Sequence, residues 1–166
     1  MNIDAVKETI RQVPDFPKKG ITFLDITTGI KNPEALQAMI DFLYDIYKDK
    51  KIDYVAGIES RGFIFGMPLA YKLNAGFIPI RKPNKLPANT IKESYDLEYG
   101  SDSIEIHADA VEKGANVVVI DDLLATGGTA TAACNLIKKA GGKVDSAAFI
   151  IELTNSFVSS SDAFNI

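Results

Sequence analysis

Residues 117–129 read VVVIDDLLATGGT, and this stretch decides the fold that we expect for the chain. Its first four residues are β-branched, which predicts a strand buried on both faces, as strands of parallel sheets are. The apolar run stops at Asp121 and Asp122, so we expect a loop to begin near Asp122. Residues 126–129 then open a helix whose apolar positions recur at Ala133, Leu136 and Ile137. Strand, loop and helix in this order predict one unit of an α/β fold.

The loop of this unit has the composition of an anion-binding site. Glycine lets the backbone approach a phosphate closely, threonine hydroxyls add donors, and a helix N-terminus favours negative charge. The carboxylates of Asp121 and Asp122 accept hydrogen bonds from the paired hydroxyls of a ribose, or hold a hydrated divalent cation. This combination predicts a sugar phosphate; the alternative is an ordinary turn with a threonine cap. The residues predicted to bind phosphate are Ala125, Thr126, Gly127, Gly128 and Thr129.

Length and composition limit the class of protein. A chain of 166 residues with 46% hydrophobic content is long enough for one domain with a real core. A net charge of −4 argues against nucleic acid as the main ligand. We find no apolar run of transmembrane length and no export signal, so we expect a cytoplasmic protein without a membrane partner. One cysteine and one histidine exclude a disulfide framework and a Cys/His metal cluster.

The N-terminal part of the chain predicts two helices and an extended segment. Apolar spacing from Ile3 to Ile10 predicts a short amphipathic helix that ends before Pro14. Residues 18–27 alternate loosely and predict a short strand or a flap, in which Phe23 either joins the core or stacks on a ligand. Asn32 is expected to cap a helix that runs to about Lys48.

Two further apolar runs, residues 53–58 and 76–80, predict short buried strands. Pro79 in the second run indicates a strand near an edge of the sheet. An acid, a hydroxyl and a cation follow the first run, and three cations in five positions follow the second. In isolation such a cationic loop is solvated, but its place at a strand end suggests a binding role. These polar residues are Glu59, Ser60 and Arg61, then Arg81, Lys82 and Lys85.

The rest of the chain predicts a hairpin and a last strand. Residues 93–99 and 103–107 alternate around a turn at 100–102, which predicts a hairpin that projects between two α/β units as a lid. Residues 144–153 predict a final strand that ends at Glu152 and Leu153.

Four strand ends therefore carry polar motifs. Because parallel strands share one direction, all four motifs are expected to meet at one edge of the sheet, where ligands of α/β proteins bind. Such a site suits a ligand with an anionic half, a hydroxylated middle and an apolar cap.

Several motifs together resemble the type I phosphoribosyltransferases, in particular those that act on adenine. The resemblance rests on DDLLATGGT at 121–129, GITFLDI at 20–26, ESRGF at 59–63, RKPNKLP at 81–87 and SYDLEYG at 94–100. It implies an α/β fold with a mostly parallel sheet flanked by helices, in a single domain over residues 1–166. It also implies a small N-terminal hood over about residues 1–30 and a β-hairpin lid over about residues 88–107.

The same resemblance implies roles for individual residues. Asp121 and Asp122 lie near the ribose or the metal, and the Glu59–Ser60 peptide bond is expected to be cis. Asn84 stands where glycine is usual, and Leu24 where arginine or lysine is usual, although only its backbone is expected to contact the base. By resemblance the catalytic residues are Glu98 and Tyr99, the pyrophosphate ligands Glu59, Ser60, Arg61, Arg81, Lys82 and Lys85, and the base-binding residues Phe23, Leu24 and Leu153. From the sequence alone Glu98 is a surface carboxylate.

The implied reaction uses adenine and phosphoribosyl pyrophosphate, gives AMP and pyrophosphate, needs Mg²⁺ and takes place in a homodimer. No direct protein ligand for the metal is assigned. Two alternatives stay open. An oxopurine phosphoribosyltransferase usually carries Asp where this chain has Ala125, and alanine cannot handle a proton. A regulator with this fold would sense the ligand without catalysis.

Overall fold

The structure is a computed structural model that describes residues 1–96 and 100–153. Glu98 and Tyr99, expected to be catalytic, and the Ser-rich tail from residue 154 lie outside the described residues. The chain forms two compact units, residues 1–46 and residues 47–166. Within the described ranges, no helix has the length and apolar content that crossing a membrane requires.

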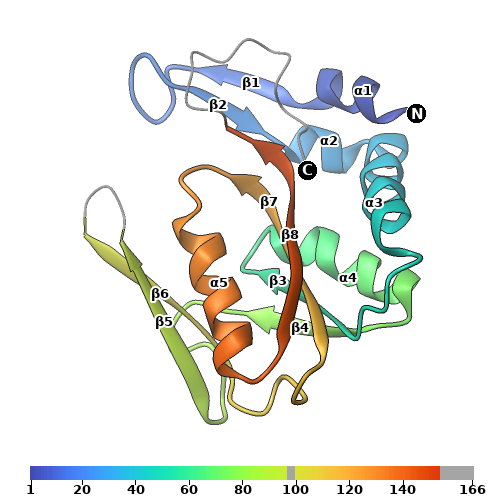
Figure 1. The fold of residues 1–166 in the computed structure, drawn as a ribbon. Helices are drawn as coiled ribbons and strands as arrows, with labels where there is room; N and C mark the ends of the chain where they lie inside the picture. Colours follow the sequence, from blue (N-terminus) through green and yellow to red (C-terminus); the bar gives the residue numbers. More distant parts are fainter. Residues whose placement is uncertain (97–99, 154–166) are drawn as a thin grey trace. The chain divides into compact units, whose positions relative to one another are not determined.

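The first unit contains short elements and a two-stranded antiparallel sheet (Figure 1). The expected helix from Ile3 to Ile10 is present from Ile3 to Thr9, as an α-helical turn followed by a 3₁₀ turn, and is wrong only at Ile10, which is already extended with φ −86° and ψ 120°. The following residues instead pair with a second strand, where Arg11 forms an ion pair of 2.5 Å with Asp25. Strand pairing satisfies backbone groups that so short a helix leaves exposed. The elements are α1 (Ile3–Val6), η1 (Lys7–Thr9), β1 (Arg11–Pro14), β2 (Thr22–Asp25) and α2 (Thr27–Lys31).

Helix α3 (Pro33–Tyr47) begins and ends as its sequence predicts. The side-chain oxygen of Asn32 accepts hydrogen bonds from the backbone N–H groups of Glu34 and Ala35, at 3.0 and 3.2 Å. This is the expected cap, and Pro33 takes the first helical position, where no N–H is needed.

The second unit is built on a four-stranded parallel sheet in the order β4-β3-β7-β8. This confirms the predicted α/β class and places β4, with Pro79, at an edge. The elements are β3 (Tyr54–Ile58), α4 (Gly62–Leu73), β4 (Gly76–Ile80), β7 (Asn116–Leu124), α5 (Gly128–Lys139) and β8 (Lys143–Glu152).

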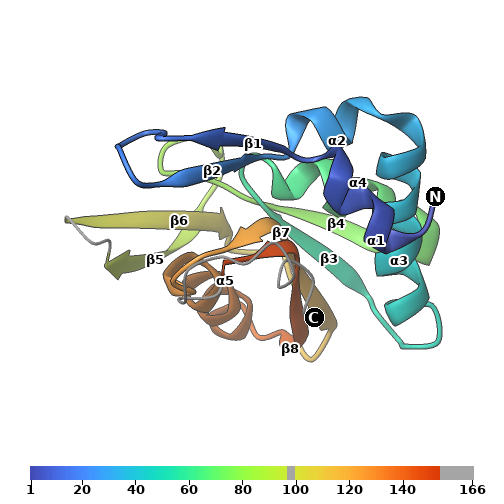
Figure 2. The same cartoon turned by 90° about the horizontal axis from the view of Figure 1, so that it is seen from above.

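Helices cover both faces of this sheet (Figure 2). Helix α5 packs on the face that carries Ala56 and Ile58. Helix α4 packs on the opposite face, where a side chain on Gly66 would lie 3.6 Å from the Cα of Gly57. Residues 117–120 of β7 are fully buried between these layers, as four successive β-branched residues predict.

Strand β7 is longer than its sequence suggests, and the expected loop start near Asp122 is wrong. Pairing with β8 continues through Leu123↔Ile151 and Leu124↔Glu152. A strand ends where its neighbour stops pairing with it, and β8 supplies partners beyond the two acids. Both carboxylates are consequently held on a strand.

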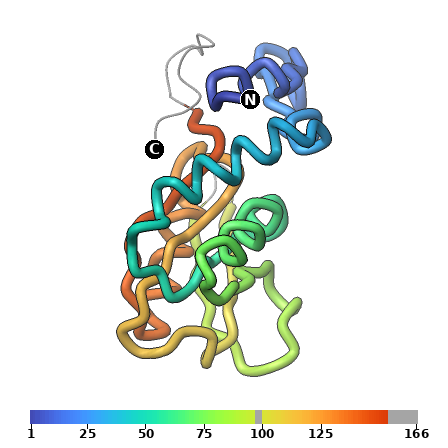
Figure 3. The backbone as a smooth tube through the Cα atoms, turned by 90° about the vertical axis from the view of Figure 1, so that its right-hand side faces the viewer, coloured from blue at the N-terminus to red at the C-terminus, as the bar shows by residue number. Residues whose placement is uncertain are grey.

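The predicted hairpin is present as β5 (Thr90–Asp96) and β6 (Ser101–His107). It starts three residues before Glu93, where the alternating pattern begins, and within the lid expected over about residues 88–107. Ile104 and Ile106 are buried in the core beneath α5, and an isolated bridge joins Arg81 to Glu105. Figure 3 traces the chain from α4 through β4 toward this hairpin.

Candidate active site

The four polar motifs of the second unit meet at one edge of the sheet, as predicted. Nε of Arg61, after β3, lies 2.6 Å from Oδ2 of Asp122 on β7. Nε of Arg81, after β4, lies 3.0 Å from Oε2 of Glu59. The backbone N–H of Leu153, after β8, donates to the carbonyl of Leu124 at 2.8 Å. Contacts between neighbouring strand ends thus run across the whole sheet.

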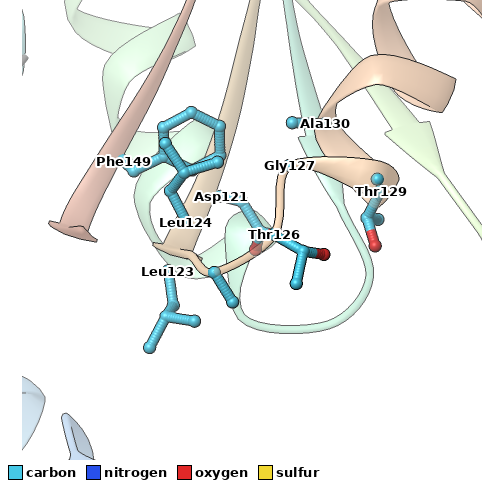
Figure 4. Close-up of a pocket in the computed structure, with 10 residues that line it drawn as sticks. Asp121, Leu123, Leu124, Thr126, Gly127, Thr129, Ala130 and Phe149 are labelled. Carbon is cyan, nitrogen blue, oxygen red and sulfur yellow. The ribbon is translucent and has the colours of Figure 1, made fainter. Parts of the chain in front are cut away.

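The loop after β7 forms a pocket at the N-terminus of α5 (Figure 4). Gly127 precedes the helix with φ +81°, a conformation that favours glycine, and no side chain caps the helix. The first N–H groups of α5 are therefore not capped from within the loop, as an anion site requires. The cavity measures about 160 Å³ and is lined by Asp121, Leu123, Leu124, Ala125, Thr126, Gly127, Gly128, Thr129, Ala130 and Phe149.

Sequence reasoning missed four of these lining residues. Phe149 lies on β8 directly opposite Asp121, and its ring lies beside Leu124 in Figure 4. That position follows from the register between β7 and β8, which contains an irregularity between Val117 and Val118. No pattern in the local sequence predicts the register between two strands. Leu123, Leu124 and Ala130 were near enough to the motif to be included by adjacency.

Asp121 and Asp122 place two carboxyl groups next to each other at the end of β7. Oδ1 of Asp121 accepts a hydrogen bond of 2.9 Å from the backbone N–H of Asp122. Burial, together with the charge of Asp122, raises the pKa of Asp121 to about 7. Burial also raises the pKa of Asp122, although Arg61 opposes that shift. Both carboxyl groups can accept hydrogen bonds from hydroxyl groups, and they do so most strongly in the ionised form.

The turn between β3 and α4 fits closely against the end of β7. A side chain on Gly62 would lie 2.6 Å from the carbonyl oxygen of Ile120, so only glycine is accommodated. The Glu59–Ser60 peptide bond is cis, as the resemblance implied. This close approach places Arg61 beside the carboxylate pair.

Two of the three predicted cations after β4 are paired with acids from elsewhere in the chain. Glu59 binds the guanidinium of Arg81, and Lys82 bonds through Nζ to the carboxylate of Asp102 and to the hydroxyl of Tyr95, the latter at 2.9 Å. The ammonium group of Lys82 is thus directed to the hairpin. Lys85 is exposed.

Asn84, where glycine was expected, adopts φ +63°. Asparagine tolerates this left-handed conformation better than most residues, so the turn survives the replacement.

The expected base-binding residues are divided between the two units. Phe23 and Leu24 lie on β2 of the first unit, where the ring of Phe23 meets that of Phe16 edge-on at 5.3 Å. Leu153 lies in the second unit, partly buried at the end of β8. Among the residues that the structure describes, no cluster of three or more metal-binding side chains occurs.

A parallel α/β sheet with a glycine-rich loop, an acidic pair and a cationic loop at one edge is the architecture of phosphoribosyltransferases. A family model described as "Phosphoribosyl transferase domain" matches residues 28–163, so the chain belongs to this family.

Individual relatives of this chain carry a more specific name than the family model does. The adenine phosphoribosyltransferase of Koribacter versatilis is 57% identical over 150 residues, covering 90% of this chain and 82% of that protein. The enzyme of the same name from Clostridium perfringens strain 13 is 55% identical, covering 90% and 87%.

The solved structures that resemble this chain carry the same enzyme name as these relatives. Adenine phosphoribosyltransferase from Thermoanaerobacter pseudethanolicus has a TM-score of 0.87 at 52% identity, covering 91% of this chain and 88% of that chain. The Saccharomyces cerevisiae enzyme, crystallised with adenine and an imino-altritol bisphosphate, has a TM-score of 0.86 at 41% identity, with the same coverages.

Proposed function

We propose that this chain transfers the 5-phosphoribosyl group of phosphoribosyl pyrophosphate to adenine, giving AMP and pyrophosphate in purine salvage. The observation that carries the proposal is the meeting of the phosphate loop, the acidic pair and the cationic loop at one sheet edge. Each part suits one portion of the substrate, and the relatives named above share the activity by name.

The 5-phosphate binds in the pocket between Ala125 and Thr129, where glycine backbone, hydroxyls and the start of α5 meet. Asp121 and Asp122 accept hydrogen bonds from the ribose hydroxyls and favour the positive charge that develops on the sugar ring. Arg61, Arg81, Lys82 and Lys85, with the Ser60 backbone, bind the pyrophosphate.

In the reaction the bond between the anomeric carbon and pyrophosphate breaks, and its electron pair leaves with pyrophosphate. A ring nitrogen of adenine attacks that carbon from the opposite face and then loses its proton. In this proposal Glu98 receives the proton and Tyr99 assists in the lid, whose closure excludes water from the activated ribose. Phe23, the Leu24 backbone and Leu153 hold the base.

The residues of the site fit a magnesium ion that arrives with its substrate. Mg²⁺ is usually held by one or two carboxylates plus phosphate oxygens and water, and Asp121 lines the pocket with Asp122 next to it in the chain. When bound, the ion supplies positive charge at the pyrophosphate.

We also propose that the chain acts as a homodimer in the cytoplasm. Helix α4 exposes Ile64, Met67 and Tyr71 at 37%, 53% and 87% of their surfaces. This i, i+3, i+7 spacing gives one apolar face, which a two-fold axis pairs with its own copy. The cytoplasm is where the proposed substrates are made and used.

A pyrophosphate-release assay with adenine, hypoxanthine, guanine and xanthine in turn tests the activity. We expect turnover with adenine and at most weak turnover with the others, because Ala125 supplies no group for an oxopurine. Turnover with an oxopurine alone would refute the adenine assignment. No turnover with any base would leave the regulator as the remaining explanation.

A further inference from the structure

The carboxylate of Glu59 has its hydrogen bonds committed to the cationic loop. Its Oε2 accepts from Nε of Arg81 at 3.0 Å and from the backbone N–H of Lys82 at 2.9 Å. Its Oε1 accepts from Nη2 of Arg81 at 3.4 Å. The side chains of Glu59 and Arg81 are 19% and 31% exposed, so water competes only partly for these bonds.

This arrangement does not suit a direct ligand of pyrophosphate. An ionised carboxylate accepts hydrogen bonds and donates none, so it repels phosphate oxygens. The pairing with Arg81, helped by the Lys82 N–H and the charge of Lys85, lowers the pKa of Glu59 and keeps it ionised. Glu59 therefore acts on an anionic ligand through the residues that it holds.

The loop that begins at Arg81 is fastened at a second point. Its Arg81 backbone exchanges hydrogen bonds with Glu105 at 2.9 and 2.8 Å. The backbone N–H of Asn84 donates to Oε2 of Glu105 at 3.3 Å. Glu59 is the one of these anchors that orients the guanidinium, and a guanidinium has five N–H donors, so donors on Nη1 remain for a phosphate oxygen.

We propose that Glu59 is a positioning residue, which holds the Arg81 side chain and the Lys82 backbone in the geometry that binds pyrophosphate. The proposal rests on the proposed function, because it names how the pyrophosphate part of that site is organised. It reassigns Glu59 from the predicted ligands to their support.

The Glu59→Gln variant tests this by the sign of its effect. If Glu59 only added negative charge, removing the charge would tighten binding of magnesium pyrophosphate. Positioning predicts the opposite, a loss of about ten- to a hundredfold, since charged hydrogen bonds are lost. We would titrate magnesium pyrophosphate calorimetrically and measure KM for phosphoribosyl pyrophosphate. That KM should rise, while KM for adenine stays close to the wild-type value.

The Glu59→Asp variant separates the effect of side-chain length from the effect of charge. Aspartate keeps the charge but is one methylene shorter, so it cannot hold both Arg81 and the Lys82 N–H at these distances. We expect weakened pyrophosphate binding here too. Binding as tight as in the wild type, in either variant, would overturn the proposal.

A double-mutant cycle identifies the path of the effect. In an Arg81→Ala background, Glu59→Gln should lose most of its effect on pyrophosphate binding, because the group that it orients is gone. Additive effects would refute an action through Arg81. Asp145→Asn is the matched control, because Asp145 is also a carboxylate paired with a cation, Lys50, at 3.0 Å, and belongs to no part of the site.

Different results would refute the proposed function and the positioning role of Glu59. If the wild-type protein makes no AMP, the proposed function fails, but the pyrophosphate titration still decides the role of Glu59. If AMP is made and Glu59→Gln binds pyrophosphate normally, only the positioning role fails.

Discussion

Asp121 is the residue in which burial and chemistry conflict most directly. The proposed site needs its carboxylate oxygens beside the ribose, yet folding removes it from water while its chain neighbour Asp122 keeps a second carboxyl group close by. Both effects favour the protonated form, so the protein retains a proton that the unfolded chain has lost at the same pH. The cost appears as stability that depends on pH.

The sign of that dependence follows from the direction of the shift. Folding raises the pKa of Asp121 from 3.8 to about 7, so its contribution is fully present below pH 4 and is lost as the pH rises to 7. Asp121→Asn should therefore stabilise the free protein at pH 8 by about 2–4 kcal/mol, and by little at pH 4. Thermal unfolding at pH 4, 6 and 8 measures this. An equal gain at all three pH values would contradict the assignment.

Asp145→Asn provides the contrast. The pairing with Lys50 lowers the pKa of Asp145, so its removal should cost stability at neutral pH and not at acid pH. The Asp121→Asn variant should also form AMP more slowly than the wild type. The reason is that it removes a negative charge that stabilises the positive charge developing on the sugar ring.

At the scale of elements, the corner between β7 and α5 depends on two adjacent glycines that have different roles. Gly127 has a positive φ and precedes the helix, whereas Gly128 is its first residue. A side chain on Gly128 would meet nothing closer than 3.5 Å, at the carbonyl oxygen of Asp96. The conformational demand therefore falls on Gly127 alone.

This difference gives a paired prediction. Gly127→Ala should lower the free energy of unfolding by about 1–2 kcal/mol, because alanine is strained in the left-handed conformation. Gly128→Ala should leave it unchanged or raise it by up to about 1 kcal/mol, because alanine favours helix. Urea unfolding of both variants measures the difference. Equal losses in the two would show that φ at residue 127 is not the cause.

At the scale of the whole molecule, the apolar face of α4 formed by Ile64, Met67 and Tyr71 stays exposed to solvent in a single chain. Tyr71→Glu should shift the proposed dimer toward monomer, because a carboxylate would be buried without a partner at the two-fold interface. Sedimentation velocity over a range of concentrations measures the shift. Lys51→Gln is the control, because it changes the net charge equally at another exposed residue. A wild-type chain that stays monomeric would refute the dimer, and an unaffected dimer would move its interface elsewhere.

The local sequence was sufficient for much of this molecule. The α/β class, the sheet strands, the Asn32 cap and the polar motifs at four strand ends were predicted correctly from apolar periodicity and turn residues. These features depend on neighbours along the chain, and one direction shared by parallel strands is enough to bring their ends together.

Pairing between distant segments was beyond local patterns. Several features depend on such pairing between distant segments. They are the extension of β7 past Asp122, the place of Phe149, the strand after Ile10, and the ion pairs Arg61–Asp122 and Arg81–Glu59. Strand order and register set these contacts, and a shift of one residue would turn each side chain to the other face of the sheet. The residue types of the site can thus be predicted from the sequence alone. Their contact partners and protonation states are decided by tertiary packing.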